Sequence, residues 1–107
     1  MEFTSDFLIT LLQSMWLYSP LLLLFISLIT FIGQIVGRVE GWSIFDALYW
    51  SFITAFTVGY GDIHPSSKPA RLMSILIALL GIMFTGFIVA ITVNVAAEVY
   101  QRHLADV

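Results

Sequence analysis

Two long stretches without a charged side chain constrain this sequence more strongly than any other feature. No charged residue occurs between Phe7 and Gly37, and none occurs between Leu72 and Ala97. Each stretch exceeds the roughly 20 apolar residues that an α-helix needs to cross a bilayer. The chain is 60% hydrophobic and only 10% charged, whereas about a quarter of the residues in an ordinary soluble domain carry a charge. We therefore expect an all-α membrane protein with a single domain, residues 1–107, and two transmembrane helices.

The composition also argues against several classes of protein. The chain has four basic residues and a net charge of −3, so we expect no nucleic acid partner, because such partners require a basic surface. Cysteine is absent, which excludes disulfides and thiolate metal sites. The sequence contains no paired acid–base groups, no activated nucleophile and no cluster of metal ligands. We therefore expect no catalytic residue and no enzymatic activity.

Proline positions help to set the expected limits of the helices. Pro20 suits the first turn of a helix, where its missing N–H would be unpaired anyway, so we expect an outer helix over 20–37. Apolar residues recur at helical spacing over 7–18. That segment is either a separate interfacial helix or an early part of the outer helix that bends at Pro20. A loop with two prolines precedes the inner helix, which we expect over 71–100.

The connection between the two long helices contains a segment of a different kind. Ser43 is followed three residues later by Asp46, which is the spacing of a capping box. We expect a helix over 44–56, too short to span a bilayer and typical of re-entrant structure. A glycine-rich run, 57–62, follows directly, and unpaired backbone at membrane depth is tolerated only inside protein or beside water. The sequence therefore predicts several copies of the chain around a water-filled pathway.

The glycine-rich run reads Thr57-Val58-Gly59-Tyr60-Gly61-Asp62. Gly59 and Gly61 can adopt a positive φ without steric cost. Alternation of left-handed and ordinary conformations points successive carbonyl oxygens to one side, and a ring of such strands can replace the hydration shell of a cation. Val58 and Tyr60 would then point into the packing behind the strand. The C-terminal end of helix 44–56 would place its partial negative charge at the base of the strand.

The hexapeptide resembles the signature sequence of potassium channels. Residues 20–100 resemble the bacterial two-transmembrane pore module of that family, with its outer helix, pore helix, selectivity filter and inner helix. The resemblance implies a homotetramer in the lipid bilayer that conducts K⁺ passively through a central pore. It implies that K⁺ binds to the hydroxyl of Thr57 and to backbone carbonyl oxygens. By this resemblance, the filter would consist of Thr57, Val58, Gly59, Tyr60 and Gly61, and its ion-binding carbonyls would be those of Thr57, Val58, Gly59 and Tyr60.

The resemblance also implies which side chains support the filter. Asp62 is expected to form a hydrogen bond with the side chain of Tyr49. Tyr60 is expected to bond to the side chain of Trp50. Together these contacts would brace the filter from behind.

Two positions behind the filter depart from the family pattern. Ile53 stands where a bacterial member has a glutamate that pairs with the filter aspartate, and Phe56 stands where many members have threonine. Permeation should survive both changes. We expect them to affect slow inactivation of the filter.

The inner helix carries two glycines. By resemblance, Gly81 is at the hinge where the helix bends to open a gate, and Gly86 stands where relatives have another small residue. The alternative for either glycine is close packing against another helix. We favour the hinge for Gly81 and packing for Gly86. The face expected to line the water-filled cavity consists of Ile82, Thr85, Val89, Val93 and Ala97.

Ionisable side chains follow at the end of the inner helix. We place Glu98 on or near the cavity-lining face, where four copies would raise the cation concentration at the inner mouth. The alternative is a solvated residue at the end of the helix. His103 is expected to be solvated.

The basic residues give an ambiguous orientation. Arg38, Lys68 and Arg71 lie in the connection between the spans, so the positive-inside rule would place this connection in the cytoplasm. The resemblance places it outside, and we prefer that orientation because the bias of three basic residues to one is small. We expect a multi-pass protein of the plasma membrane (the inner membrane of the cell) with both termini cytoplasmic.

Gating is the least determined property. The sequence has no arginine-rich segment that could sense voltage. It is either a pore alone or the pore of a longer channel with a further regulatory domain or subunit, and the gating stimulus stays open. Two alternative functions also stay open: a non-selective cation channel of the same architecture, and a non-conducting membrane subunit.

Overall fold

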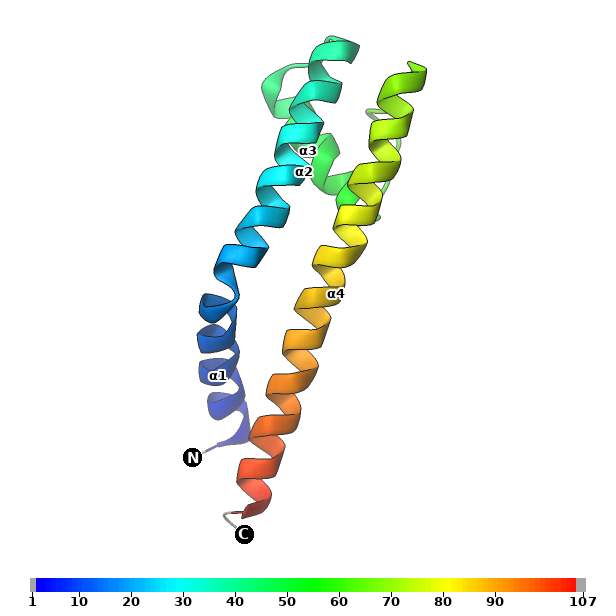
Figure 1. Cartoon of the computed structure of the whole chain (residues 1–107). Helices are drawn as coiled ribbons and strands as arrows, with labels where there is room; N and C mark the ends of the chain where they lie inside the picture. The colour runs from blue at the N-terminus through cyan, green and yellow to red at the C-terminus, as the bar shows by residue number, and fades with distance from the viewer. Residues whose placement is uncertain (1, 106–107) are drawn as a thin grey trace.

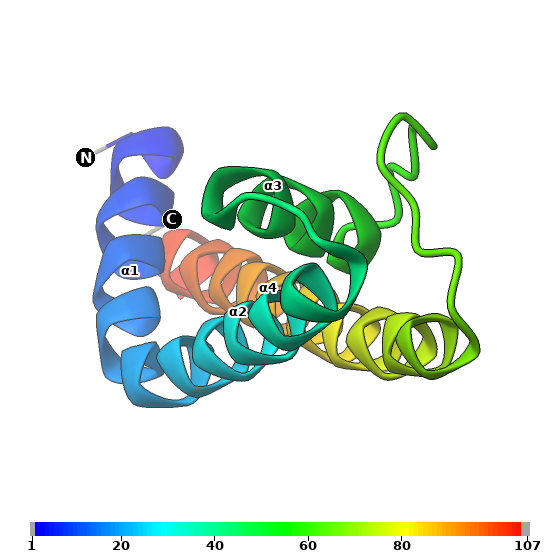
Figure 2. The ribbon, with the colours of Figure 1, turned by 90° about the horizontal axis from the view of Figure 1, so that it is seen from above.

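The structure, a computed structural model, describes residues 2–105. It consists of four α-helices: α1 (Phe3–Leu17), α2 (Ser19–Glu40), α3 (Ile44–Ala55) and α4 (Lys68–Ala105). The two long helices α2 and α4 run antiparallel, and α3 packs against their upper ends (Figure 1). Seen from above, α3 lies to one side of this pair and α1 turns away from the line of α2 (Figure 2). The expected all-α fold with two long apolar helices is confirmed.

The molecule is elongated, with extents of 60 × 22 × 19 Å. The start of α1 and the end of α4 lie at the same end, as two antiparallel spans require (Figure 1). Of the most apolar stretch of each long helix, only 33% of α2 and 17% of α4 is buried inside the chain. Core helices of a soluble protein would be mostly buried. The apolar surface of α2 and α4 therefore needs lipid or further copies of the chain to cover it.

The outer helix α2 is longer than the predicted 20–37. It begins one residue earlier, with Pro20 in its first turn, and continues to Glu40. The charged residues at its end do not stop the helix, because Arg and Glu are good helix formers. Gly41 stops it by adopting a left-handed conformation with φ 76°, which is the usual role of glycine just beyond a helix.

The short helix α3 begins as the capping pattern predicts. The side chain of Ser43 accepts a hydrogen bond from the Asp46 N–H at 3.1 Å. The helix ends at Ala55, one residue before the predicted end, and Phe56 is its C-cap.

The inner helix α4 exceeds the predicted 71–100 at both ends. Pro69 lies in its first turn rather than in the preceding loop, because proline lacks only an N–H that this turn does not need. The Ser67 hydroxyl oxygen accepts a hydrogen bond from the Ala70 N–H at 3.4 Å. At the other end, packing against α1 extends the helix to Ala105.

The segment before Pro20 is a separate helix, not an early part of the outer helix. α1 ends at Leu17, Tyr18 leaves helical geometry with ψ 3°, and α2 begins at Ser19. α1 then packs along the lower part of α4 (Figure 1). The apolar contacts are made by Phe7, Leu11 and Met15 of α1 with Ile91, Val95 and Val99 of α4.

Polar contacts strengthen the packing between α1 and α4. The His103 Nε2 atom lies 2.8 Å from Asp6 Oδ2, and the ring of Phe3 meets the His103 imidazole edge-on. Arg102 donates a hydrogen bond to the Thr10 hydroxyl at 2.6 Å. The prediction that His103 is merely solvated is therefore wrong. Sequence spacing could not reveal the contact, because the two residues are 97 positions apart.

Small residues allow α2 to approach α3 closely. A Cβ atom on Gly33 would lie 1.6 Å from the Ser51 hydroxyl oxygen, and one on Gly37 would lie 2.6 Å from the Ala47 Cβ. The four-residue spacing of the two glycines is typical of tight contacts between membrane helices. This contact fixes the position of the short helix against the outer helix.

Candidate functional site

The candidate site is the segment between α3 and α4. Its backbone φ is positive at every second residue: 61° at Thr57, 58° at Gly59 and 81° at Gly61. The two glycines adopt the predicted conformation. Thr57 was not predicted to do so, because positive φ is a genuine outlier for a β-branched residue. Thr57 lies two residues before Gly59 and four before Gly61. This alternate-residue spacing is the only sequence signal that could have indicated the positive φ of Thr57.

The inner end of this segment is tied to α3 by backbone hydrogen bonds. The N–H groups of Val58 and Gly59 donate to the Ile53 carbonyl at 3.0 and 3.3 Å, and the Thr57 N–H donates to the Thr54 carbonyl at 3.2 Å. The segment therefore begins directly at the C-terminal end of α3. The negative end of the helix dipole adjoins Thr57, as predicted, and favours a cation there.

The Thr57 hydroxyl donates its proton to the Phe56 carbonyl at 2.6 Å. Its oxygen keeps lone pairs that can coordinate a cation. The ring of Phe56 packs against Phe52 and Phe84, with centroid distances of 5.7 and 5.9 Å. The base of the segment thus contacts the inner helix directly through two aromatic rings.

The outer end of the segment is held by the hydrogen bond expected from the resemblance. The Tyr49 hydroxyl donates to Asp62 Oδ2 at 3.1 Å. Burial and this hydrogen bond to Asp62 raise the pKa of the Tyr49 phenol. The ring hydroxyl therefore keeps the proton that it donates.

The other expected support is not present within the chain. Tyr60 is 72% exposed, whereas Trp50 is 4% exposed and packs edge-on against Trp42 at 5.2 Å. In the described part of the chain, no hydrogen bond joins Tyr60 to Trp50. Val58 is also half exposed, so the packing expected behind the strand cannot come from this chain alone.

The residues predicted to line a cavity occupy one uncovered side of α4. All five are exposed, whereas the opposite side of the helix is buried against the other helices. The exposed residues are Ile82, Thr85, Val89, Val93 and Ala97, and the buried ones are Ile77, Gly81, Phe84, Ile91, Val95 and Val99. Only Thr85 of the exposed set is polar.

The two glycines of α4 differ in their surroundings. A Cβ on Gly81 would lie 1.9 Å from the carbonyl oxygen of Ala55, at the end of α3. Nothing lies within 4 Å of the corresponding position on Gly86. Close packing inside the chain thus occurs at Gly81, and the packing predicted for Gly86 is not found within the chain.

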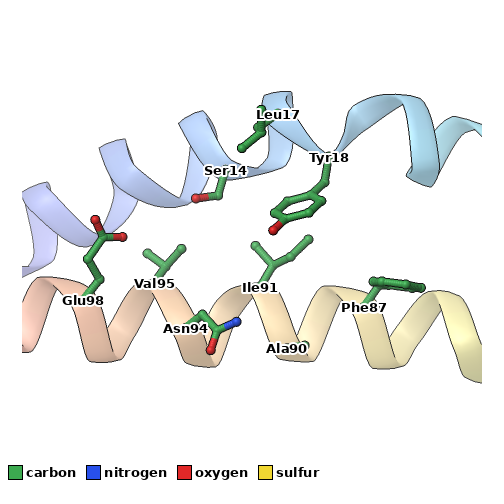
Figure 3. Close-up of a pocket in the computed structure, with 9 residues that line it drawn as sticks. All are labelled: Ser14, Leu17, Tyr18, Phe87, Ala90, Ile91, Asn94, Val95 and Glu98. Atoms are coloured by element: carbon green, nitrogen blue, oxygen red, sulfur yellow. The ribbon is translucent and has the colours of Figure 1, made fainter.

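Glu98 lies at the edge of a cavity between α1 and α4. Its carboxylate points toward α1 (Figure 3), where it lines a cavity of about 340 Å³ together with Ser14, Tyr18 and Asn94. The cavity forms where the break at Tyr18 separates α1 from α2. Glu98 points about 100° around the helix axis from Ala97, because consecutive helical residues differ by that angle. Its expected role at the inner mouth of the pore stays a prediction.

Comparison with known proteins identifies the family. A family model described as ion channel matches residues 7–98. The chain therefore belongs to this family of ion channels. Together with its two long apolar helices, this makes it a membrane protein.

Several curated relatives are similar to parts of the chain. A putative potassium channel protein, YugO, from Bacillus subtilis is 31% identical over 94 residues, which cover 81% of this chain and 28% of the relative. TWiK family of potassium channels protein 7 from Caenorhabditis elegans is 40% identical over 53 residues, covering 50% of this chain and 10% of the relative. A voltage-gated potassium channel from Aeropyrum pernix is 48% identical over 40 residues, covering 37% and 14%. The chain thus spans a small part of each relative, and no solved structure matches it significantly.

Proposed function

We propose that four copies of this chain surround a central pore and form a potassium-selective channel. The K⁺ ligands are the carbonyl oxygens of Thr57, Val58, Gly59 and Tyr60 and the hydroxyl of Thr57. The observation that carries the proposal is the left-handed conformation at Thr57, Gly59 and Gly61. Alternation of this kind turns successive carbonyls to one side, where a ring of strands can replace the water around K⁺.

Potassium is the proposed ion for two reasons. Residues 57–61 have the same sequence as the known potassium filter. The relatives that match this chain bear the names of potassium channels. The chain acts as a passive pathway rather than as an enzyme, and K⁺ is the transported substrate.

A tetramer would satisfy the surfaces that a single chain leaves open. Backbone groups of an irregular segment at membrane depth must be buried in protein or face water. In a tetramer, the exposed Tyr60 and Val58 gain neighbours, and the uncovered side of α4 (Ile82, Thr85, Val89, Val93, Ala97) surrounds a water-filled cavity. The Tyr60 hydroxyl would then reach Trp50 of an adjacent copy.

The proposed location is the plasma membrane, with both termini in the cytoplasm and the filter toward the outside. α1 would lie near the cytoplasmic surface, beside the inner half of α4. The chain has no cysteine, so a cysteine in place of Ser66 can be labelled alone. Labelling only from the cytoplasmic side would overturn this orientation.

Opening of the pore is proposed to involve bending of α4 near Gly81. The contact of Gly81 with Ala55 gives such a bend a direct mechanical link to the base of the filter. The chain spans only a small part of its relatives. The proposal therefore includes regulation of the gate by a further domain or subunit.

Two other functions make different predictions. A non-selective cation channel would conduct Na⁺ as well as K⁺, and a non-conducting subunit would carry no flux at all. Reversal potentials with K⁺ on one side of a bilayer and Na⁺ on the other distinguish a non-selective channel from the proposed potassium-selective channel. Rubidium uptake into vesicles, together with chemical cross-linking of the purified chain, separates the second.

The assignment of the filter is tested by substitution. Replacing Tyr60 and Gly61 together is expected to abolish the preference for K⁺ while the chain still cross-links to tetramers. Bi-ionic reversal potentials provide the measurement. An unchanged preference for K⁺ would overturn the assignment.

A further inference from the structure

The cavity between α1 and α4 is separate from the proposed filter. Its volume of about 340 Å³ falls in the range of ligand-binding pockets, about 300–1,000 Å³. The Glu98 carboxylate lies at one end of the cavity and the Phe87 ring at the other (Figure 3). A helical rise of about 1.5 Å per residue puts these two residues roughly 16 Å apart along α4. The shape suits a long ligand with a charged end and an apolar end.

Apolar side chains form the walls between these two ends. Leu17 comes from α1, and Ile91 and Val95 come from α4. Ile91 and Val95 are buried, because α1 packs against them. The break in the chain at Tyr18 opens the space beside them, since α1 and α2 separate there. The middle of the cavity therefore favours an apolar chain.

Four polar side chains also face the cavity. Ser14 and Tyr18 come from the N-terminal part of the chain, and Asn94 and Glu98 come from α4 (Figure 3). Within residues 2–105, none of these four side chains makes a hydrogen bond to the rest of the chain. Their donors and acceptors are therefore available to a ligand.

The basic side chains beside Glu98 have other partners. Arg102 lies four residues after Glu98, a spacing at which Glu and Arg can pair on a helix. It instead donates a hydrogen bond to the Thr10 hydroxyl at 2.6 Å. His103 contacts Asp6 at 2.8 Å. In the described part of the chain, Glu98 thus forms no ion pair, and a cationic ligand would supply the missing charge.

We infer that this cavity binds a single-chain amine, with its ammonium group at Glu98 and its apolar tail along Ile91 toward Phe87. A primary alkylamine is protonated near neutral pH, as a lysine side chain is. Its N–H groups can donate charge-assisted hydrogen bonds to the Glu98 carboxylate. A phospholipid with an amino group fits less well, because the carboxylate repels the phosphate that such a lipid carries. The inference is independent of the proposed function, since the site contains no residue of the filter.

The test is hydrogen exchange, measured by mass spectrometry, while n-decylamine is titrated into the purified chain in a non-ionic detergent. A ligand that contacts both helices should hold α1 on α4 and slow the exchange of residues 3–17. n-Decanol has the same tail without the charge and serves as the matched control. We expect protection by decylamine at concentrations where decanol gives none. Equal protection by both compounds would overturn an amine site.

The role of Glu98 is tested by E98Q, which removes the charge and keeps the shape of the side chain. We expect the midpoint of the decylamine titration to rise roughly fivefold, as loss of a hydrogen bond to a charged group at an exposed site implies. E2Q makes the same chemical change on an exposed residue outside the cavity and should leave the midpoint unchanged. A parent midpoint in E98Q would overturn the contact with Glu98.

The location of the site is tested by filling the cavity. S14L adds an apolar side chain that occupies the space from α1, and we expect decylamine to lose its protective effect. Q13L adds the same side chain at the neighbouring exposed position and should bind decylamine like the parent. Protection that persists in S14L would place the amine elsewhere, for example in the central pore, and would overturn the site. A90L fills the cavity from α4 and provides the same test if S14L does not fold.

A final comparison separates the two sources of an ammonium group. Lysophosphatidylethanolamine carries the ammonium next to a phosphate, and we expect it to give no protection of residues 3–17. Protection equal to that by decylamine would overturn the single-chain amine in favour of a phospholipid. None of these measurements needs a K⁺ current. A chain that carries no current but binds decylamine would overturn only the proposed function, and a K⁺-selective chain that decylamine does not protect would overturn only this inference.

Discussion

Thr57 shows how much of the proposed filter depends on single residues. Its φ of 61° is unfavourable for a β-branched side chain. The neighbouring N–H groups of Val58 and Gly59 hold it in place by bonding to the Ile53 carbonyl. At the other end of the segment, one hydrogen bond from the Tyr49 phenol to the Asp62 carboxylate holds Asp62 in place.

Tyr49→Phe tests this outer hydrogen bond. The substitution keeps the ring and removes only the donor, so the outer end of the filter should relax more readily and K⁺ current should decay roughly threefold faster. Sustained recordings in a planar bilayer measure the decay. Tyr100→Phe removes an exposed hydroxyl from the end of α4 and should have no effect; equal decay in both variants would contradict the role of Tyr49.

At the scale of elements, close contacts between backbones set the positions of the helices. α3 is held between α2 and α4, because Gly33 and Gly37 face it on one side and Gly81 on the other. α3 in turn carries the inner end of the proposed filter. Changes in these helix contacts should therefore reach the filter without touching it.

Gly81→Ala tests the contact between α3 and α4. The added Cβ would lie 1.9 Å from the Ala55 carbonyl oxygen, so the helices must separate, at a cost of about 1–3 kcal/mol as in other overpacked cores. Thermal unfolding of the purified protein in detergent measures the loss. Gly86→Ala adds the same atom where nothing lies within 4 Å and should be neutral or slightly stabilising, since alanine favours the helix. Equal stability of the two variants would show that α3 and α4 are not in tight contact.

The docking of α1 on α4 is a second property of elements. Asp6→Asn removes the carboxylate that contacts His103, and the amide protons of 3–17 should then exchange roughly two to five times faster, as expected for a partly exposed pair. Hydrogen exchange measured by mass spectrometry reports this, with α2 as the internal reference. The exposed Thr4→Ala change serves as the control. Exchange in α1 that stays at the parent rate in the Asp6 variant would mean that apolar packing alone holds the helix.

At the scale of the whole molecule, the exposed apolar side chains of one chain would face two different environments in the proposed tetramer, the water-filled cavity and the lipid. Val93 and Leu24 are exposed to similar extents, 59% and 54%, yet the proposed tetramer places Val93 beside water. Leu24 lies on the outer helix α2. The structure of a single chain does not separate these environments, because both side chains are exposed to similar extents in it.

Single cysteines distinguish the two surfaces, since the chain contains none of its own. A cysteine at Val93 should react with a charged, water-soluble thiol reagent and reduce the K⁺ current. A cysteine at Leu24 should stay unreacted, because a charged reagent does not enter lipid. Reaction at both positions, or at Leu24 alone, would contradict the proposed arrangement.

Local chemistry made much of the structure predictable. The charge-free stretches predicted α2 and α4 because only helices of that length satisfy their own backbone in lipid. Ser43 predicted the start of α3, and the glycines predicted two of the three left-handed residues in the segment 57–62. The helix ends were less accurate, because a helix continues as far as its neighbours support it, as α4 does beside α1.

The sequence by itself determined the two long apolar helices, the short helix between them and the segment that forms the candidate filter. Each of these follows from neighbours along the chain, through apolar length, capping and the conformational freedom of glycine. Only the tertiary structure placed Glu98 beside α1, paired Asp6 with His103 and joined Glu40 to Ser66. These contacts link residues far apart in the sequence, and no local pattern specifies which distant partner a charged side chain will meet.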